Sequence, residues 1–392
     1  MEYPFQPEVL DALPEELAEL FRALEITLLE EICSRLNAAD QLNEVTVQDI
    51  RALRTHGIDL KSIEKAISDT SGISKTKLDK LLDDVVERNQ KYYTEIIDLA
   101  HITQPETLVD AAEVAAIRTQ TLDTFRNLTA SIGFLVDNGR TMLSPAKAYQ
   151  WALDNAVMQV QNGVINYNQA IKTVVKQLAD SGLKAVDYES GHRDQIDVAA
   201  RRAVMTGVSQ ICARYTEQSA EYLETPYFEV SAHAGARDKP GPSLWSNHKD
   251  WQGKVYSVQT GDIYPSIYEV CGLGAVDGLE GANCRHRRNV WVEGVSERTY
   301  TDEQLEHIDD GLGCTFDGKT YTAYEATQMQ RRVERQIIKQ KRLVTAYKAS
   351  EQTDEYRAAK IKLTRLNSKY NAFSEAAKLP LQWERTKVLY DR

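Results

Sequence analysis

The sequence predicts an α+β protein in three parts: a long, mainly helical N-terminal region (residues 1–225), a small, turn-rich α+β domain (226–322) and a helical C-terminal hairpin (323–392). Three observations support this prediction. Apolar residues recur at spacings of three and four in the first and last parts, as they do in amphipathic helices. Between Phe228 and Tyr300 glycines become frequent, and short stretches alternate apolar and polar side chains, as strands do. A chain of 392 residues has room for two or three such domains.

The N-terminal region is expected to be a series of helices. Pro14 sits where the first turn of a helix favours proline, and an apolar stripe runs from Leu17 to Leu36 after it. No glycine-rich phosphate loop interrupts the series, so we expect the helices to pack on one another or on a partner. The further predicted helices are Thr46–Gly57, one beginning at Ser74, Glu106–Leu128, Pro145–Gln161, Tyr167–Ser181 and Ile196–Leu223.

The middle domain contains both strand and turn signals. A single turn of helix is predicted at Ser266–Val270, and a capping box at Thr301–Gln304 opens a helix that reaches about Asp309. Asp317 and Gly318 are suited to the positive φ angles of a type I′ hairpin turn. The predicted strands are Tyr227–His233, Lys254–Val258 and Arg288–Val292.

The C-terminal part begins with a second capping box at Thr322–Glu325. Further on, apolar residues step by three and four from Tyr356 to Ala377, which is the spacing of a helical seam. This seam predicts either an antiparallel hairpin with the preceding helix or a contact between copies of the chain. The short loop at Ser350–Thr353 favours the hairpin.

Charge is distributed unevenly along the chain. The net charge of −11 disfavours binding of duplex DNA by the molecule as a whole. Residues 325–392, however, carry 16 Lys and Arg against 8 Asp and Glu, whereas residues 1–130 carry 13 against 25. Two interpretations stay open: both ends are solvated helix faces, or the basic end approaches DNA or an acidic partner.

The five cysteines are odd in number and widely scattered, which fits a reducing compartment better than a disulfide framework. The first ten residues are acidic and lack the apolar core of a secretory signal. No apolar run is long enough to span a membrane. We therefore expect a soluble protein that is made and kept inside a cell, with no membrane partner.

The middle domain gathers four side chains of the types that zinc prefers: His233, His248, Cys284 and His286. Residues i and i+2 of an extended segment face the same way, so Cys284 and His286 are able to share a site. The metal interpretation is a structural zinc that pins the loops together. The competing interpretation is that these side chains hydrogen-bond loop carbonyls and fill turns, and that no cofactor is bound.

Two enzymatic alternatives use the same residues. Cys284 with His233 or His248 would form a nucleophile and base, and the arginines at 285, 287 and 288 would favour the thiolate. Alternatively, the three histidines would hold a metal in a nuclease, although paired carboxylates are missing. The basic run Arg285–Arg288 either contacts phosphate or pairs with acids nearby, such as Asp277, Glu280 and Glu293.

Several blocks, in fixed order, resemble the phage minor capsid protein 2 family. They are EVSAHAGAR (Glu229–Arg237), HKDWQGKVYS (His248–Ser257), YPSIYEVCGLG (Tyr264–Gly274), GLEGANCRH (Gly278–His286) and SERTYT (Ser296–Thr301). Upstream, NLTASIGF, GVINYNQAI, QLADSGLKAVDYESG and DVAARRAVMTGVSQ are similar to the family as well. The pattern of two histidines before NCRH is more loosely similar to Mu-type head morphogenesis proteins.

The resemblance implies a structural minor head protein of a tailed bacteriophage or prophage. It would assemble in the host cytoplasm, enter the virion head near the portal vertex as an oligomer, and contact the portal protein, the major capsid protein or both. It implies no catalysis. We add the hypothesis that the helical N-terminal region docks on protein while residues 323–392 approach packaged DNA. The alternative is a head-associated, metal-dependent hydrolase or transferase built on residues 226–322.

Overall fold

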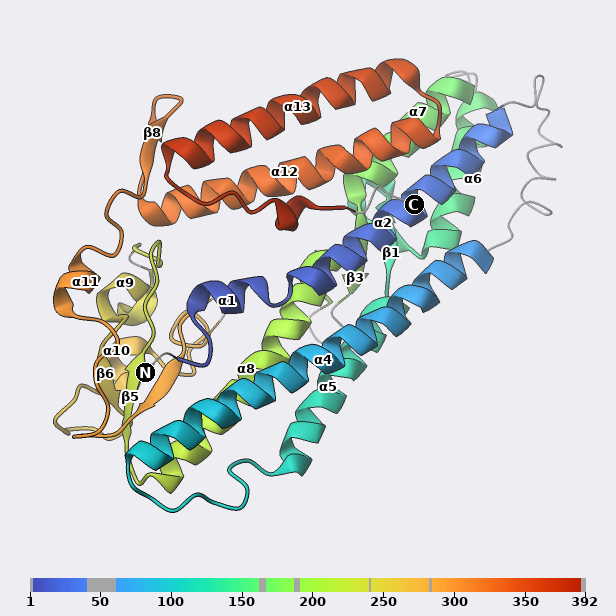
Figure 1. Cartoon of the computed structure of the whole chain (residues 1–392). Helices are drawn as coiled ribbons and strands as arrows, with labels where there is room; N and C mark the ends of the chain where they lie inside the picture. The colour runs from blue at the N-terminus through green and yellow to red at the C-terminus, as the bar shows by residue number, and fades with distance from the viewer. Residues whose placement is uncertain are drawn as a thin grey trace.

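Figure 1 shows the computed structural model, which describes residues 3–40, 61–161, 167–186, 191–239, 241–281 and 284–388. Helices dominate both ends of the chain, and short antiparallel sheets lie between them, so the predicted α+β class is confirmed. The longer helices are α2 (Glu15–Asp40), α4 (Lys61–Leu99), α5 (Ala111–Ala130), α6 (Pro145–Gln161), α7 (Tyr167–Ser181), α8 (Ile196–Tyr222), α12 (Ala323–Ala349) and α13 (Thr353–Ala376).

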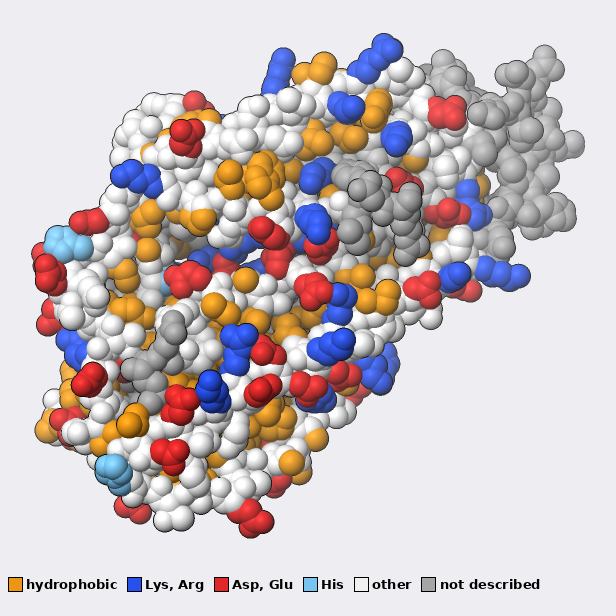
Figure 2. Space-filling model, viewed as in Figure 1, with side chains coloured by type: hydrophobic (Ala, Val, Ile, Leu, Met, Phe, Trp, Pro, Cys, Tyr) orange, Lys and Arg blue, Asp and Glu red, His pale blue; other side chains and the backbone are white. Residues whose placement is uncertain are grey.

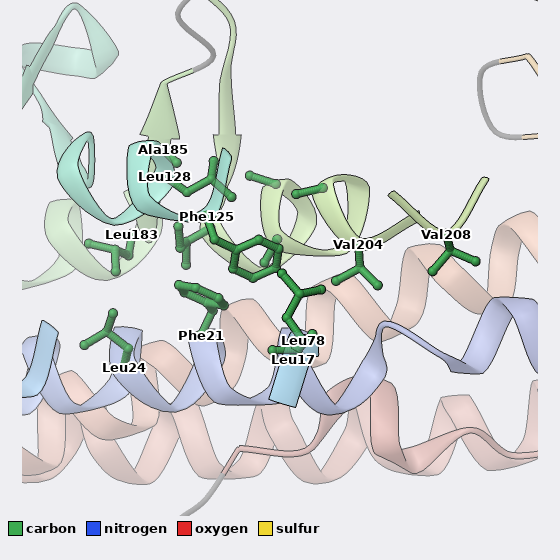
Figure 3. Packing of buried hydrophobic residues seen from close by; sticks show 14 of the residues in the cluster. Leu17, Phe21, Leu24, Leu78, Phe125, Leu128, Leu183, Ala185, Val204 and Val208 are labelled. Carbon is green, nitrogen blue, oxygen red and sulfur yellow. The ribbon is translucent and has the colours of Figure 1, made fainter. Parts of the chain in front are cut away.

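The main core lies among α2, α4, α5 and α8, which run side by side (Figure 1). The three-four spacing on α2 puts Leu17, Phe21 and Leu24 on one buried face, as predicted. Figure 3 shows this face meeting Leu78 of α4 and Phe125 of α5, and the Phe21 and Phe125 ring centroids lie 5.8 Å apart. This apolar contact explains why helices with such polar outer faces form a stable bundle.

A four-stranded sheet lies within the mainly helical N-terminal region, and its strands were not predicted. Its antiparallel order is β2–β1–β3–β4. Strands of three or four residues are too short to show a clear alternation in the sequence. Tertiary packing decides instead, because Phe134, Val136 and Leu183 are buried against the neighbouring helices. The strands are β1 (Gly133–Val136), β2 (Thr141–Leu143), β3 (Leu183–Val186) and β4 (Arg193–Gln195), with the 3-10 turn η1 (Asp137–Gly139) after β1.

Helix boundaries in the first hundred residues differ from the prediction at two points. A short helix, α1 (Pro7–Ala12), precedes α2. Ser74 does not begin a helix, because α4 runs through it without a break and its hydroxyl donates to the Ser71 carbonyl 2.9 Å away. That bond within the helix replaces the capping role expected of serine. The predicted helix Thr46–Gly57 lies outside the described residues.

The middle domain is built on a second antiparallel sheet, in the order β6–β5–β7. The three predicted strands are present, although β5 ends at Val230, before His233. Ser266 caps α10, and the hairpin turn has the predicted positive φ angles of 50° at Asp317 and 76° at Gly318. The elements are β5 (Tyr227–Val230), η2 (Leu244–Ser246), α9 (His248–Trp251), β6 (Val255–Ser257), α10 (Ile267–Cys271), β7 (Arg288–Trp291), α11 (Asp302–Glu306), β8 (Cys314–Phe316) and β9 (Lys319–Tyr321).

The C-terminal helices α12 and α13 form the predicted antiparallel hairpin within one chain (Figure 1). Both sides of the Thr322 capping box are present at the start of α12. The seam buries Tyr370 between Val333 and Ile337, and the Tyr370 hydroxyl donates to Glu334 Oε1 at 3.0 Å. The chain then returns along α12 to the 3-10 turn η3 (Trp383–Thr386).

Contacts cross both of the predicted domain boundaries. Helix α12 packs on α2 and α7, and the start of the chain reaches the middle domain, where the Tyr3 hydroxyl donates to Glu229 of β5. The division into three domains stays a prediction. None of the described helices combines the length and the apolar character needed to cross a bilayer.

A buried ion pair joins α12 to the N-terminal bundle. Arg342 Nη1 lies 3.1 Å from Glu25 Oε1 of α2, and it donates to Gln195 Oε1 at 2.9 Å. Gly182, which ends α7 with a φ of 65°, leaves room for this pair, since a Cβ there would sit 1.5 Å from Arg342 Nη1. Glycine is therefore required at this position both for its backbone conformation and for the close approach.

Candidate metal centre

The four histidine and cysteine side chains singled out in the sequence lie together at one end of the β5–β7 pair. The pairing continues past the strands, because the Ser231 N–H donates to the Arg287 carbonyl at 2.8 Å. His233 follows β5 and His286 precedes β7, so the ladder brings these two residues face to face. Their rings stack with centroids 4.6 Å apart and planes 25° from parallel.

Helix α9 brings the third histidine to the cluster. His248 opens this helix, and the ring centroid of His248 lies 5.4 Å from that of His286. The side chain of Asn247 caps the helix, and the Lys249 N–H donates to the Arg237 carbonyl at 3.1 Å, which fixes α9 against the segment after β5. These contacts place His248 at the edge of the cluster.

Three of the four groups have ligand atoms close to one another. One ring nitrogen each of His248 and His286 and the Sγ of Cys284 all lie within 4.8 Å of one another. Cys284 Sγ is 3.5 Å from His286 Nδ1. In a tetrahedral zinc site the ligand atoms lie roughly 3.3–3.8 Å apart, as follows from bond lengths of about 2.0–2.3 Å. The separation of Cys284 from His286 falls within this range, whereas the limit of 4.8 Å for the whole set is wider than such an ion requires.

His233 occupies a different position in the cluster. Its Nδ1 faces the Ala234 carbonyl oxygen at 2.9 Å, and its ring covers the face of the His286 ring. Among the described residues, the ring nitrogens of His233 are not part of the set of converging ligand atoms. The structure therefore gathers all four predicted residues, but only three of them around a common point. Metal binding itself stays a prediction.

Two oxygen acceptors fix which nitrogen of each histidine carries the proton. His248 Nε2 is 2.9 Å from the Asp277 carbonyl oxygen, and His286 Nε2 is 3.0 Å from Gln252 Oε1. Gln252 Oε1 also accepts the His233 backbone N–H at 3.1 Å. An amide nitrogen could not accept this bond, so the atom that faces the two histidines is the amide oxygen. Both histidines therefore hold their proton on Nε2, which leaves the lone pair on Nδ1.

Burial keeps the imidazoles neutral. Burial lowers the pKa of His233 to about 4 and also lowers the pKa of His248 and of His286. His286 is only 1% exposed, and the indole of Trp251 packs against it with ring centroids 4.9 Å apart. A neutral imidazole is the form that binds metals.

The structure gives the Cys284 thiol a neighbour that the nucleophile hypothesis did not include. His286 Nδ1 lies 3.5 Å from Cys284 Sγ, and a ring nitrogen of His248 lies within 4.8 Å of that sulfur. Burial raises the pKa of Cys284, which disfavours the thiolate that such chemistry needs. The sequence did not indicate that Gln252 and the Asp277 carbonyl would contact the histidines, because an amide and a backbone carbonyl carry no metal-ligand signal.

The basic run around His286 is held by local acids and by distant segments. Arg288 pairs with Glu280 at 3.4 Å, as predicted, and with Glu217 of α8 at 2.7 Å. Arg287 Nη2 donates to Ser209 of α8. Arg285 lies 3.8 Å from Asp11 of α1. These contacts favour ion pairing within the chain as the role of the run.

Comparison with protein-family models matches residues 5–375 to the family described as phage minor capsid protein 2. The chain belongs to this family. The match covers nearly the whole chain, which confirms the resemblance noted in the sequence, and it gives the protein a structural role in the phage virion. No curated protein and no solved structure matches the chain.

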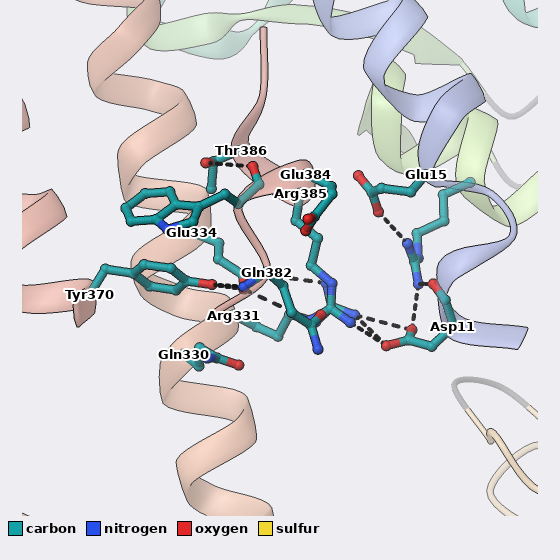
Figure 4. A network of polar contacts seen from close by, with 12 residues as sticks. Asp11, Glu15, Gln330, Arg331, Glu334, Tyr370, Gln382, Glu384, Arg385 and Thr386 are labelled. Atoms are coloured by element: carbon teal, nitrogen blue, oxygen red, sulfur yellow. Dashed lines mark hydrogen bonds and ion pairs between the residues drawn. The ribbon is translucent and has the colours of Figure 1, made fainter. Parts of the chain in front are cut away.

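Figure 4 shows a second polar cluster of this minor capsid protein, around Asp11, and Arg285 links it to the candidate metal centre. Asp11 of α1 is contacted by four guanidinium groups, which come from segments far apart in the chain. Burial alone would raise the pKa of Asp11, but the four cations outweigh it and hold that pKa well below its ordinary value. The four are Arg201 of α8, Arg285 next to the histidine cluster, Arg331 of α12 and Arg385 of η3.

Proposed function

We propose that this protein is a non-catalytic structural component that assembles into the phage head at the portal vertex, with the portal protein or the major capsid protein as its neighbour. The observation that carries this proposal is the family match over residues 5–375. The architecture supports it: long helices join into one bundle through buried contacts that span almost the whole sequence, as the Asp11 cluster and the Glu25–Arg342 pair illustrate.

Exposed apolar side chains of the middle domain offer a surface for a protein neighbour. Leu244, Ile263 and Val276 are 93%, 69% and 78% exposed. All three lie in the turns around α10, and Figure 2 shows apolar side chains at this end of the molecule. Exposed apolar side chains mark a contact surface when they gather into one patch. We propose that this domain joins the N-terminal helices in docking on the neighbouring head protein.

The enzymatic alternative receives less support from the geometry. A catalytic metal needs an open coordination position that substrate can reach. Here two of the three candidate ligands, His248 and His286, are no more than 2% exposed, and Trp251 covers them. Such a setting suits a group that holds the domain together.

Assembly can be tested in a phage that carries this gene. The triple variant Leu244→Ser, Ile263→Ser and Val276→Ser is expected to fold but to be missing from purified heads, because the apolar contact to its neighbour is removed. The control replaces exposed apolar residues outside the middle domain and the N-terminal helices, Ile361→Ser and Leu381→Ser. Protein content of the heads is measured by quantitative mass spectrometry, and position by immunogold electron microscopy.

Wild-type heads are expected to carry label at a single vertex. Label spread over the whole shell would contradict the portal location. Equal incorporation of the triple variant and the control would instead show that the apolar turns of the middle domain are not the docking surface.

The outer face of α13 is the part of the chain best suited to packaged DNA. Arg357, Lys360, Lys362 and Arg365 are exposed and have no ion pair among the described residues, and no carboxylate occurs between Glu355 and Glu375. Blue side chains lie over α13 in Figure 2. Unpaired cations on a helix face are suited to phosphates, because they release counterions when they bind.

DNA binding is best tested in the full chain, since α12 packs on α2 and α7 and a C-terminal fragment would lack this packing. We expect weak, salt-dependent binding of duplex DNA, measured by fluorescence anisotropy. Changing Arg357, Lys360, Lys362 and Arg365 to Gln should reduce the slope of log K against log salt by about 0.9 for each phosphate that the helix no longer neutralises. The control changes Lys65, Lys75, Lys80 and Lys91 of α4 to Gln, which alters the net charge equally. Identical slopes for the two quadruple variants would rule out a DNA contact at α13.

A further inference from the structure

We propose that the middle domain binds one structural zinc ion through His248, Cys284 and His286, and that His233 supports the site without being a ligand. This inference is independent of where the protein sits in the virion. It rests on three observations: the convergence of the ligand atoms, the hydrogen bonds on the far side of each ring, and the structure of the segment that the ion would hold.

The ligand atoms converge from two separate segments. His248 comes from α9, while Cys284 and His286 come from the stretch before β7, and their ligand atoms lie within 4.8 Å of one another. One of these separations, 3.5 Å from Cys284 Sγ to His286 Nδ1, already matches the spacing of two ligands on one zinc ion. Small movements of side chains would therefore complete the coordination.

The hydrogen bonds made by the Nε2 atoms of His248 and His286 are typical of histidines in a metal site. A histidine that binds a metal through one nitrogen usually donates the other N–H to a carbonyl or carboxylate oxygen. His248 does so to the Asp277 carbonyl, and His286 does so to Gln252 Oε1. Because both Nε2 atoms are engaged in this way, Nδ1 is the nitrogen that would bind the ion in each case.

The chemistry of the three ligands favours zinc over magnesium and calcium. Two imidazoles and a thiolate are softer than the oxygen ligands that magnesium and calcium require. When zinc binds, the Cys284 thiol loses its proton to solvent and the sulfur forms the bond to the ion, while both histidines bind as neutral rings. A water molecule would fill the fourth position, which the burial of His248 and His286 keeps from any substrate. No oxidation or reduction is involved.

The ion would hold a long segment that has little regular structure. Between the end of α10 at Cys271 and the start of β7 at Arg288, the described residues contain no helix or strand. Loops of this length in a compact domain need their own anchors. Zinc would tie Cys284 and His286 at the end of this segment to α9, and the Asp277 carbonyl in its middle already accepts from His248.

His233 acts as a positioning residue in this arrangement. Its ring stacks on His286 and restricts the rotation of that ring, while the Gln252 oxygen joins the His233 backbone N–H to His286 Nε2. The variant His233→Asn is therefore expected to keep zinc but to bind it about tenfold more weakly, as is typical when a group behind the ligands is removed.

The test uses the tag-free full-length protein, because a histidine tag binds metal itself. Grown with zinc and dialysed, the wild type should contain about one zinc per chain by elemental mass spectrometry. Cys284→Ser and His248→Asn should each lose it, whereas Cys314→Ser and His307→Asn, which lie outside the cluster, should retain it. Circular dichroism establishes that each variant is folded.

A second measurement does not depend on variants. Chelator-treated wild-type protein titrated with Co²⁺ should show the near-ultraviolet charge-transfer absorption of a cobalt–thiolate bond, and zinc should abolish it. If the chelator-treated wild-type protein shows no cobalt–thiolate absorption after Co²⁺ is added, the proposal is wrong. Loss of zinc in His233→Asn at saturating concentration would overturn the three-residue ligand set. Neither result depends on the location of the protein in the head, so the zinc site and the proposed function can fail separately.

Discussion

Replacing Asp11 by asparagine is expected to lower the free energy of unfolding by about 3–5 kcal/mol, which is typical when one partner is removed from a buried set of charges. The Asp11 side chain is only 11% exposed, and it is the shared partner of Arg201, Arg331 and Arg385. Glu15 and Glu334 remain near these arginines in the variant, but they do not replace the central carboxylate (Figure 4). Asparagine keeps the shape and removes only the charge, so the effect would be electrostatic.

The midpoint of urea unfolding, followed by circular dichroism, measures this loss. The matched control is Glu8→Gln on the same helix, an exposed residue for which a change within about 0.5 kcal/mol is expected. If Asp11→Asn and Glu8→Gln shift the midpoint equally, the arginine cluster does not hold the terminal segments together.

The same cluster predicts the behaviour of the protein in acid. The folded pKa of Asp11 lies below its ordinary value of 3.8, so the folded state binds fewer protons than the unfolded chain. The stability that Asp11 contributes is therefore complete above about pH 4 and is lost as the pH falls through the lowered folded value. The wild type should lose stability more steeply than Asp11→Asn in that range, and parallel curves would contradict this.

The second large effect is expected from Arg342→Met, which leaves the buried carboxylate of Glu25 without its cation. A loss of about 3–5 kcal/mol is expected at neutral pH. Burial raises the pKa of Glu25 even with Arg342 beside it, and without the arginine the carboxyl would hold its proton more tightly still. The penalty is therefore present above this raised pKa and should fade as the pH falls through it, because a protonated Glu25 needs no cation.

A double variant separates the charge effect from the loss of packing. Glu25→Gln with Arg342→Met removes both charges, and it should recover a large part of the stability at neutral pH because no unpaired charge stays buried. Arg335→Met, at an exposed position on the same helix, should have little effect. If the double variant is as unstable as Arg342→Met alone, the arginine acts through its volume and its bond to Gln195 rather than through Glu25.

Features that depend on neighbours in the sequence were predicted well. The capping box at Thr322 and the Asp317–Gly318 turn involve residues no more than three apart, so their chemistry is visible in the sequence. The apolar seam of α13 was equally clear, because its spacing extends over several turns. The four-stranded sheet was missed, since its strands are too short to establish a period.

The candidate metal centre was predicted only in its residue types. Four ligand-like side chains could be named, but His233 and His286 are 53 positions apart in the numbering and meet only because β5 pairs with β7. That pairing places the His233 ring on the face of His286 and brings the Cys284 sulfur beside its Nδ1. These positions decide which three groups converge and which one supports them. No pattern of residue spacing in the sequence predicts that distinction.

The sequence by itself determined most of the long helices, the caps at Thr301 and Thr322, the strands of the middle domain and the family to which the chain belongs. Only the tertiary structure decided which charges neutralise one another and which imidazoles meet. Asp11 and Arg385 stand at opposite ends of the chain, and nothing local to either one indicates its partner. The physical reason is range: periodicity and capping act within a few residues, whereas ion pairs and ligand clusters form wherever packing removes water between distant segments.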